Sequence, residues 1–567
     1  MVGEQPRPGR RSARRKRLLT RAAPIGGVAV LAFAVGVVAA TAPGRAERRL
    51  VTRYVSAWAK GDYPSMYSML DTSSRARTSE AEFAAAYRAA ATTATLVSIA
   101  PGHVGNRVGS AIPVPVRVRT RLFGTLLEIL QVPLAGSGSD AGVQLSDTLL
   151  FPGLRAGDQL TRHVLLPPRA AILASDGTPL AHGPDRTSPI PDVASQIAGT
   201  LGPIPAADAV GYAELGYPHG TKVGLNGLER VFQNQLAGKP GGTLLAGQRV
   251  LARTSPLRGS DVRTTINPAI ERAAVTAMGG RYAGIAAMDP RTGGLLALAG
   301  VAFSALQPPG STMKIITATG ALEAGIVKLS DTFPIQTSAN VGGFILHNAN
   351  GEACGGTFLN AFAVSCNSVF APLGAKLGAK RLVDIAERFG FNQPPSIPGS
   401  SESQIPSAAK IGSDTDVGSS AIGQGMVQST ALEMADVGAT IAMGGRRPIP
   451  TLLAHQRPHF VHVTSRHVAG LVQQMMEAVV QFGTGTSAQI PGVKVAGKTG
   501  TAELRNTTDP NNPNAGSPQN TDAWFVGYAP VGAPRVVVGA LFPGQGAGGA
   551  TAAPAVHDVL VAALHAH

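Results

Sequence analysis

A serine precedes a lysine by three residues in PPGSTMKIITATG, which runs from Pro308 to Gly320. An apolar run follows, so this stretch predicts the start of a buried helix with Ser311 at or near its N-cap. Residues i and i+3 share a helix face, so Ser311 and Lys314 can meet. A lysine in a dry pocket can lose its charge and take a proton from the serine, while N–H groups at the helix N-terminus can bind an oxyanion. The pair therefore predicts either an ordinary helix start or a nucleophile with its base.

Two further motifs carry side chains for the same chemistry. Ser365 and Asn367 lie in NAFAVSCNSVF, between apolar helical stretches, and Lys498-Thr499-Gly500 with Thr501 lies in KVAGKTGTAEL, a predicted strand. Alone, each motif is uninformative, because flanking glycines also serve close backbone approach. In this order, however, Ser-x-x-Lys, Ser-x-Asn and Lys-Thr-Gly form the motif set of penicillin-binding proteins and class A β-lactamases.

The first two motifs are expected to break and transfer the acyl bond. Ser311 is the expected nucleophile and Lys314 its base. Ser365 can relay a proton between this lysine and the leaving amine. Asn367 can bind the amide of the substrate.

The third motif is expected to hold the substrate. Lys498 supplies positive charge for a substrate carboxylate, with the Thr499 and Thr501 hydroxyls beside it. Gly500 leaves room for the substrate to lie along the strand edge. The N–H groups of Ser311 and Thr501 would form the oxyanion hole.

With these motifs the chain resembles the class B penicillin-binding proteins, the monofunctional D,D-transpeptidases of bacterial cell-wall synthesis. The resemblance extends to the stretches MDPRTGGLLALAG, AIGQGMVQSTALEMADVGATIAMGG and WFVGYAP. Upstream, RAAILASDGTPLA and GLERVFQNQLAGKPG resemble the family's dimerisation domain, although Arg-Ala-Ala-Ile stands where the family usually has Arg-Gly. AWAKGDYPSMYSML resembles the small N-terminal domain, folded like nuclear transport factor two, of resistance-type and actinobacterial members.

The expected fold class is multidomain α+β. A C-terminal β-lactamase/transpeptidase-like α/β sandwich with an antiparallel sheet follows a β-rich dimerisation-type domain and a small α+β cone domain. Asp176-Gly177 predicts a hairpin, and Leu228 to Leu236 a short amphipathic helix. The predicted segments are a basic tail (1–21), a transmembrane anchor (22–44), the small domain (46–155), the dimerisation-type domain (160–258) and the transpeptidase domain (261–567).

The predicted anchor follows from charge and apolar length. The first 21 residues carry eight arginines and lysines against one glutamate, and the next 23 residues carry no charge. That length spans a bilayer, and the basic flank predicts a cytoplasmic N-terminus with an extracytoplasmic catalytic domain. A cleaved signal peptide is the alternative, because Ala40-Thr41-Ala42 resembles a cleavage site, although Pro43 after it disfavours cleavage.

The chain has two cysteines, Cys354 and Cys366. Outside the cytoplasm they could form a disulfide, which would tie the loop at Cys354 to the helix that bears Ser365. The alternative is a pair of small buried thiols. A Cα separation above about 7 Å would exclude the disulfide.

The resemblance implies cross-linking of peptidoglycan stem peptides through a Ser311 acyl-enzyme, with β-lactams as covalent inhibitors. The expected partners are these peptides, the bilayer and a glycosyltransferase, and no nucleic acid. No cofactor is expected. No metal is expected either, because Pro458 interrupts any helix that would align the histidines of HQRPHFVH. A β-lactamase, a D,D-carboxypeptidase and a penicillin-binding sensor or scaffold stay as alternatives. No Glu-x-x-x-Asn, which would supply a deacylating base, lies between Ser365 and Lys498.

Overall fold

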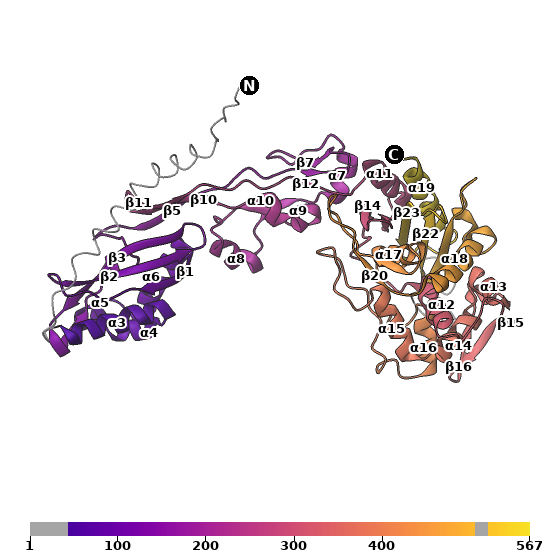
Figure 1. The fold of residues 1–567 in the computed structure, drawn as a ribbon, viewed down its shortest axis with the longest axis horizontal. Helices are drawn as coiled ribbons and strands as arrows, with labels where there is room; N and C mark the ends of the chain where they lie inside the picture. Colours follow the sequence, from indigo (N-terminus) through magenta and orange to yellow (C-terminus); the bar gives the residue numbers. More distant parts are fainter. Residues whose placement is uncertain (1–43, 505–519, 567) are drawn as a thin grey trace, which may run out of the picture. The chain divides into compact units, whose positions relative to one another are not determined.

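The structure, a computed structural model, describes residues 44–504 and 520–566. The basic tail and nearly all of the predicted anchor lie outside the described residues. In the described part, no helix combines the length and apolar character that crossing a bilayer requires. The described chain divides into two compact units: residues 44–162 with 243–252, and residues 163–242 with 253–566 (Figure 1).

The first unit packs amphipathic helices on an antiparallel sheet of order β1-β2-β3-β4. Strand β2 alternates regularly between inward and outward side chains, so one face lies on a core that contains Trp58, Tyr87 and Val118. The buried hydroxyls of Tyr54 and Tyr87 satisfy each other at 2.7 Å. The elements are α3 (Arg45–Lys60), α4 (Tyr63–Ser68), α5 (Thr72–Arg77), α6 (Glu80–Ala94), β1 (Leu96–Pro101), β2 (Ala111–Thr120), β3 (Gly124–Ala135) and β4 (Gly142–Val143).

Small sheets and short helices make up residues 160–263. The predicted hairpin is confirmed as β6 and β7, which pair antiparallel around Asp176-Gly177. The predicted helix Leu228–Leu236 forms instead as two short helices that meet at Phe232. The buried carboxylate of Glu229 forms ion pairs with Arg169 and Arg186, each at 2.6 Å. The elements are β5 (Leu160–Leu165), β6 (Ile172–Leu173), β7 (Pro179–Ala181), α7 (Pro191–Ile197), β8 (Leu201–Pro203), α8 (Ala209–Glu214), β9 (Lys222–Gly224), α9 (Gly227–Val231), α10 (Gln233–Ala237), β10 (Gly241–Ala246), β11 (Arg249–Thr254) and β12 (Val262–Arg263).

A five-stranded antiparallel sheet of order β14-β13-β23-β22-β21 organises the rest of the second unit. Its strands come from both ends of the domain sequence. They are β13 (Gly284–Asp289), β14 (Gly294–Gly300), β21 (Ala496–Glu503), β22 (Thr521–Ala529) and β23 (Val536–Phe542).

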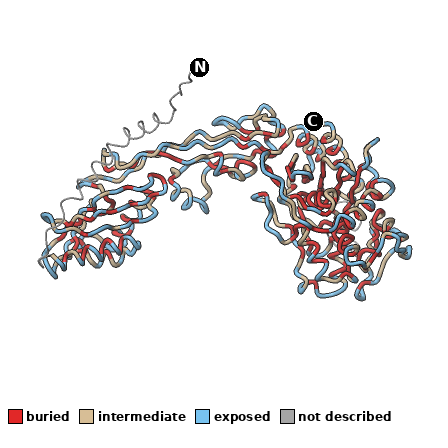
Figure 2. Tube along the Cα trace, in the orientation of Figure 1, coloured by how far each residue is buried: buried red, intermediate tan, exposed pale blue. Residues whose placement is uncertain are grey.

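Both faces of this sheet are covered, which explains why its strands are almost continuously apolar. Along β23, Val538 and Ala540 face one core, and Val537 and Leu541 face the other. Helices α11 and α19 cover the first face and α17 the second (Figure 1), and Figure 2 shows buried segments gathered in this region. The helices are α11 (Pro268–Met278), α12 (Lys314–Glu323), α13 (Phe358–Ala363), α14 (Asn367–Leu377), α15 (Ala379–Phe389), α16 (Asp414–Ala421), α17 (Ala431–Ala442), α18 (Arg466–Gln481) and α19 (Ala552–His565).

The mostly helical block between β14 and β21 also contains three two-stranded sheets. Two of them, β15-β18 and β16-β17, precede the helix that carries Asn367. The strands are β15 (Thr332–Gln336), β16 (Ser338–Val341), β17 (Phe344–His347), β18 (Cys354–Thr357), β19 (Arg446–Pro448) and β20 (Phe460–His462).

Candidate active site

Ser311 lies in a 3₁₀ turn, Gly310–Met313, that leads directly into α12. The N-cap of this turn is Pro309, whose carbonyl oxygen accepts a hydrogen bond from Thr312 Oγ1 at 2.7 Å. Ser311 is therefore inside the first turn and not the N-cap itself. Gly310, at φ +54°, donates its N–H to Gly423 O at 2.9 Å, which fixes the turn. The serine hydroxyl thus stays free of a capping role.

Strand β21 lies directly against the serine turn. A Cβ added to Gly500 would lie 2.8 Å from Pro309 O and 3.0 Å from Thr312 Cγ2. Only glycine allows this approach. The expected role of Gly500 thus gains a second part, because it also lets the strand reach the nucleophile.

The register of β21 directs the Thr501 N–H away from β22. Leu504 N donates to Asn520 O, and the ladder runs from there to Ala496 without a register shift. Bonded and non-bonded pairs alternate in an antiparallel ladder, so Thr501, opposite Ala523, belongs to a non-bonded pair. In the described sheet β21 is an edge strand. The Thr501 N–H therefore points to the open edge, as an oxyanion hole requires.

Ser365 is held in an unusual backbone conformation between α13 and α14. Its φ is +64°, a left-handed value that is uncommon for a residue with a side chain. The next residue, Cys366, is the N-cap of α14 and forms a disulfide with Cys354 at the start of β18. Their Cα atoms are 5.8 Å apart, so of the two alternatives that the sequence left open the structure has the disulfide.

Both predicted lysines converge on Ser365. Lys314 Nζ lies 2.7 Å from Ser365 O, 3.2 Å from Ser365 Oγ and 2.7 Å from Asn367 Oδ1. Lys498 Nζ donates to Ser365 Oγ at 2.9 Å and to Thr499 O at 3.1 Å. The three motifs thus meet at one hydroxyl.

Burial changes the protonation of both lysines, which are fully buried. Desolvation, together with the charge of Lys498, holds the pKa of Lys314 well below its usual value. Desolvation lowers the pKa of Lys498 to about 7. Aromatic rings supply part of the dry surroundings. The ring centroid of Phe370 lies 5.5 Å from Lys314 Nζ, and that of Phe362 lies 5.5 Å from Lys498 Nζ.

The predicted contact between nucleophile and base is not a hydrogen bond here. Among the bonds of the described residues, none joins Ser311 Oγ to Lys314 Nζ. The amine bonds instead to the Ser-x-Asn motif. In a site without substrate, catalytic hydrogen bonds are often long and tighten only in the complex.

Three contacts of the site were not anticipated from the sequence. The Thr484 hydroxyl bonds to the Thr499 hydroxyl at 2.5 Å, and Gly548 N donates to Thr501 Oγ1 at 3.3 Å. Asn367 Nδ2 donates to His347 O at 3.1 Å, which orients its amide so that Oδ1 faces Lys314. These partners lie far away in the sequence and in no motif, so no local pattern could have identified them.

Asn348 is a buried residue that supports the second motif. Its Oδ1 accepts from Ser368 N at 2.8 Å, and its Nδ2 donates to Gln336 O at 2.8 Å and Glu352 O at 2.9 Å. It therefore connects the end of β17, where His347 O lies, to the first turn of α14. In the sequence, Asn-Ala-Asn-Gly is typical of an ordinary turn, so the supporting role of Asn348 could not be predicted from this stretch.

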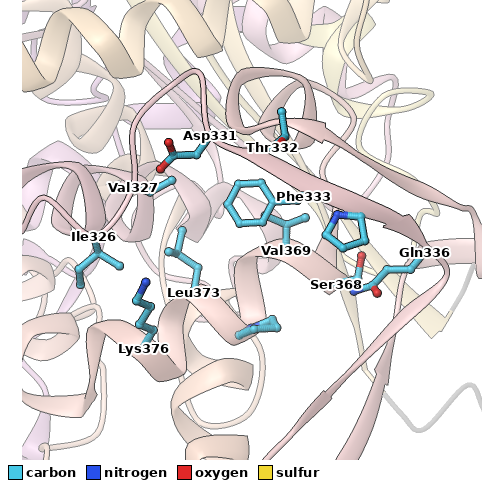
Figure 3. Close-up of a pocket in the computed structure, with 12 residues that line it drawn as sticks. Ile326, Val327, Asp331, Thr332, Phe333, Gln336, Ser368, Val369, Leu373 and Lys376 are labelled. Carbon is cyan, nitrogen blue, oxygen red and sulfur yellow. The ribbon is translucent and has the colours of Figure 1, made fainter.

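A pocket of about 440 Å³ lies beside α14 and β15 (Figure 3). Phe333, Val369 and Leu373 supply apolar walls, and Ser368 lines it near Gln336. None of the predicted catalytic residues lines it. In the described chain, no group of three or more His, Cys, Asp or Glu side chains is placed to hold a metal ion.

Three family models match this chain. The penicillin binding protein transpeptidase domain matches residues 283–561, the penicillin-binding protein dimerisation domain residues 172–264, and the NTF2-like N-terminal transpeptidase domain residues 46–158.

Relatives and solved structures agree with these matches. Peptidoglycan D,D-transpeptidase PbpA of Mycobacterium tuberculosis (strain H37Rv) is 31% identical, over 54% of this chain and 73% of the relative. PbpA of Mycolicibacterium smegmatis is 30% identical, over 64% and 82%. The penicillin G acyl-enzyme complex of penicillin-binding protein A from M. tuberculosis has a TM-score of 0.57 and 27% identity, over 70% of this chain and all of that one. This chain therefore belongs to the penicillin-binding protein transpeptidases.

Proposed function

We propose that this chain is a peptidoglycan D,D-transpeptidase that works through an acyl-enzyme on Ser311. The convergence of Lys314 and Lys498 on the Ser365 hydroxyl, with Asn367 Oδ1 accepting from the same Lys314 amine, carries the proposal. The named relatives are D,D-transpeptidases, and solved relatives form acyl-enzymes with β-lactams.

The first half-reaction acylates the serine. Ser311 Oγ attacks the carbonyl carbon of the D-Ala-D-Ala peptide bond, and its proton passes to neutral Lys314. The N–H groups of Ser311 and Thr501 bind the oxyanion of the tetrahedral intermediate. Ser365, which touches both lysines, passes a proton to the leaving amine. D-Alanine departs, and the ester on Ser311 remains.

The second half-reaction transfers the acyl group to an amine. The amine of a second stem peptide attacks the ester, gives its proton back through the same groups and releases Ser311. Before acylation, Lys498 and the Thr499 and Thr501 hydroxyls bind the terminal carboxylate of the donor peptide, which leaves with D-alanine; a β-lactam places its carboxylate there too. The substrate backbone lies along the open edge of β21.

The β-lactamase alternative lacks support at this site. A β-lactamase needs a group that activates water against the acyl-enzyme. In the described structure no carboxylate forms an ion pair with Lys314 or Lys498, and the Glu-x-x-x-Asn motif is absent between Ser365 and Lys498. An opened β-lactam keeps its amine tethered and blocks the acceptor, so its adduct should be long-lived.

We infer that residues 22–44 anchor the chain as a single span with a cytoplasmic N-terminus. The basic flank and the uncharged run support this topology. The catalytic unit then faces the peptidoglycan outside the membrane, where a glycosyltransferase partner supplies glycan strands. A reporter active only in the cytoplasm, fused after His567, should be silent, and activity of that reporter would contradict the topology.

Mass spectrometry after incubation with a fluorescent penicillin tests the site assignment. We expect one stable adduct on Ser311, its absence in Ser311→Ala with an unchanged melting temperature, and far slower formation in Lys314→Ala. An undiminished adduct on another serine in Ser311→Ala would refute the assignment. Rapid multiple-turnover hydrolysis would refute transpeptidation in favour of a β-lactamase.

A further inference from the structure

Helix α3, the first described helix, carries an unpaired arginine face. Arg45, Arg49 and Arg53 follow one another at i, i+4 spacing, and all three are exposed. In the described structure none of the three has a hydrogen-bond or ion-pair partner. Like charges at this spacing destabilise a helix. An arginine row that is kept unpaired therefore calls for an anionic partner outside the unit.

The neighbouring acidic groups leave this face unneutralised. The only acid of α3, Glu47, is buried and bonds to Arg107 at 3.0 Å. Asp140 lies in the turn that packs on α3, and its carboxylate accepts a hydrogen bond from Ser139 Oγ at 3.3 Å. The positive end of the helix dipole adds to the charge near Arg45. The local potential is therefore positive over the first turns of the helix.

A groove runs beside two of these arginines, Arg49 and Arg53. Its volume is about 580 Å³, and its lining includes Arg49, Arg53, Thr52 and the backbone turn at Gly138-Ser139. Leu50 and Ala141 supply apolar lining. A groove with two guanidinium groups and an apolar floor matches a ligand that has an anionic head and an apolar body.

The position of α3 in the chain selects the occupant. The helix begins at Arg45, immediately after the uncharged run of 22–44 that we propose as the anchor. Arg45 to Arg53 spans about 12 Å of helix axis, so the face starts where the chain would leave the bilayer. We propose that Arg45, Arg49 and Arg53 bind the phosphate groups of anionic phospholipids on the outer surface of the membrane. This contact orients the first unit on the membrane.

The test uses the full-length protein in vesicles. A fluorophore on Ser56→Cys reports the height of α3, because Ser56 is exposed on the same face and both native cysteines are in the disulfide. Energy transfer to a headgroup acceptor is compared between phosphatidylcholine vesicles and vesicles that also contain phosphatidylglycerol. We expect more transfer with phosphatidylglycerol, and loss of the gain in high salt because screening weakens the contact.

Matched variants separate this face from the general positive charge. The triple variant Arg45→Gln, Arg49→Gln, Arg53→Gln should lose the phosphatidylglycerol gain. A control that removes equal charge elsewhere, Arg117→Gln, Arg119→Gln, Arg258→Gln, should keep it. Equal transfer in both vesicles, or a gain that survives in the first triple variant, would overturn the proposal. The inference rests on the proposed anchor, so release of the chain by an alkaline wash would overturn both, whereas retention with equal transfer would overturn this inference alone.

Discussion

The Ser365 hydroxyl is the point at which the chemistry of the site is decided. It contacts both Lys314 and Lys498, so it can donate its own proton to one amine only if that amine is neutral. Burial lowers the pKa of both lysines, and the charge of Lys498 lowers that of Lys314 further. A neutral Lys314 beside a charged Lys498 therefore satisfies the hydrogen bonds and leaves a base for Ser311.

This assignment predicts a bell-shaped pH profile for penicillin acylation. The second-order rate constant reports the free enzyme, so it should fall as pH rises through about 7, where Lys498 loses the charge that binds the carboxylate. It should also fall in acid, where Lys314 gains a proton. Stopped-flow fluorescence measures both limbs. Lys498→Arg stays charged and should lose the alkaline limb, and an alkaline limb unchanged in that variant would contradict the role of Lys498.

Asn348 is expected to position Asn367 for acylation. Its removal frees the end of β17, where His347 O lies, so Asn348→Ala should slow adduct formation about tenfold, the cost of a misplaced catalytic group. Asn392 is the matched control, since it also bonds to backbone on both sides, at Ile405 O and Ile405 N, away from the site. Asn392→Ala should lower the melting temperature without slowing acylation. Equal slowing in both variants would assign Asn348 a merely structural role.

At the scale of elements, the sequence predicted what local patterns determine. The turn Asp176-Gly177 joins the predicted hairpin β6-β7, and KVAGKTGTAEL forms the predicted strand β21. Long-range contacts determine the rest. The position of Ser311 inside a 3₁₀ turn depends on Gly423, and the small sheets before α14 have strands too short to show alternation. The motifs could be identified from their order, but their common contact at Ser365 required the fold.

Gly500 tests whether the approach of β21 to the serine turn matters. An added Cβ would lie 2.8 Å from Pro309 O and 2.9 Å from Trp524 Cβ, closer than van der Waals contact. Gly500→Ala should therefore separate the strand from the turn and slow acylation. Gly470→Ala is the control, because nothing lies within 4 Å of its added Cβ and alanine favours the helix α18. An adduct rate in Gly500→Ala equal to that of the control would show that the approach is dispensable.

At the scale of the molecule, the second unit buries several carboxyl groups that are raised in pKa. Desolvation raises the pKa of Glu271 and Glu433 to about 7 and of Asp522 to about 6. Desolvation, together with the charge of Glu433, also raises the pKa of Asp436 well above its ordinary value, although Arg447 lies 3.8 Å away. Each of these groups binds its proton more tightly in the folded chain, so its contribution to stability falls as pH rises from its ordinary pKa to the raised one. For the buried lysines, whose pKa is lowered, the contribution to stability rises with pH instead. The pH dependence of the whole protein therefore mixes both signs, and a test needs a variant that changes one group alone.

Glu271 isolates the effect of one buried carboxyl group on stability. In the described structure its carboxylate accepts a single hydrogen bond, from Leu298 N at 2.7 Å. Glu271→Gln keeps an acceptor for that N–H and cannot ionise. Near the ordinary pKa of 4.5 the two proteins should be equally stable. As pH rises to about 7 the variant should gain over the wild type, by roughly 1.4 kcal/mol per unit of pKa difference at most.

The chain's two tryptophans make the measurement specific to one unit. Trp58 lies in the first unit and Trp524 is fully buried in the second. In a Trp58→Phe background, fluorescence reports the melting of the second unit alone. We expect Glu271→Gln to melt above the parent at pH 7 and above, with the difference closing as pH falls toward 5, because protonation removes the cost of burying the charge. A difference that is constant across this range would mean that the carboxyl is ionised, or neutral, throughout, and would remove Glu271 from the pH dependence of stability.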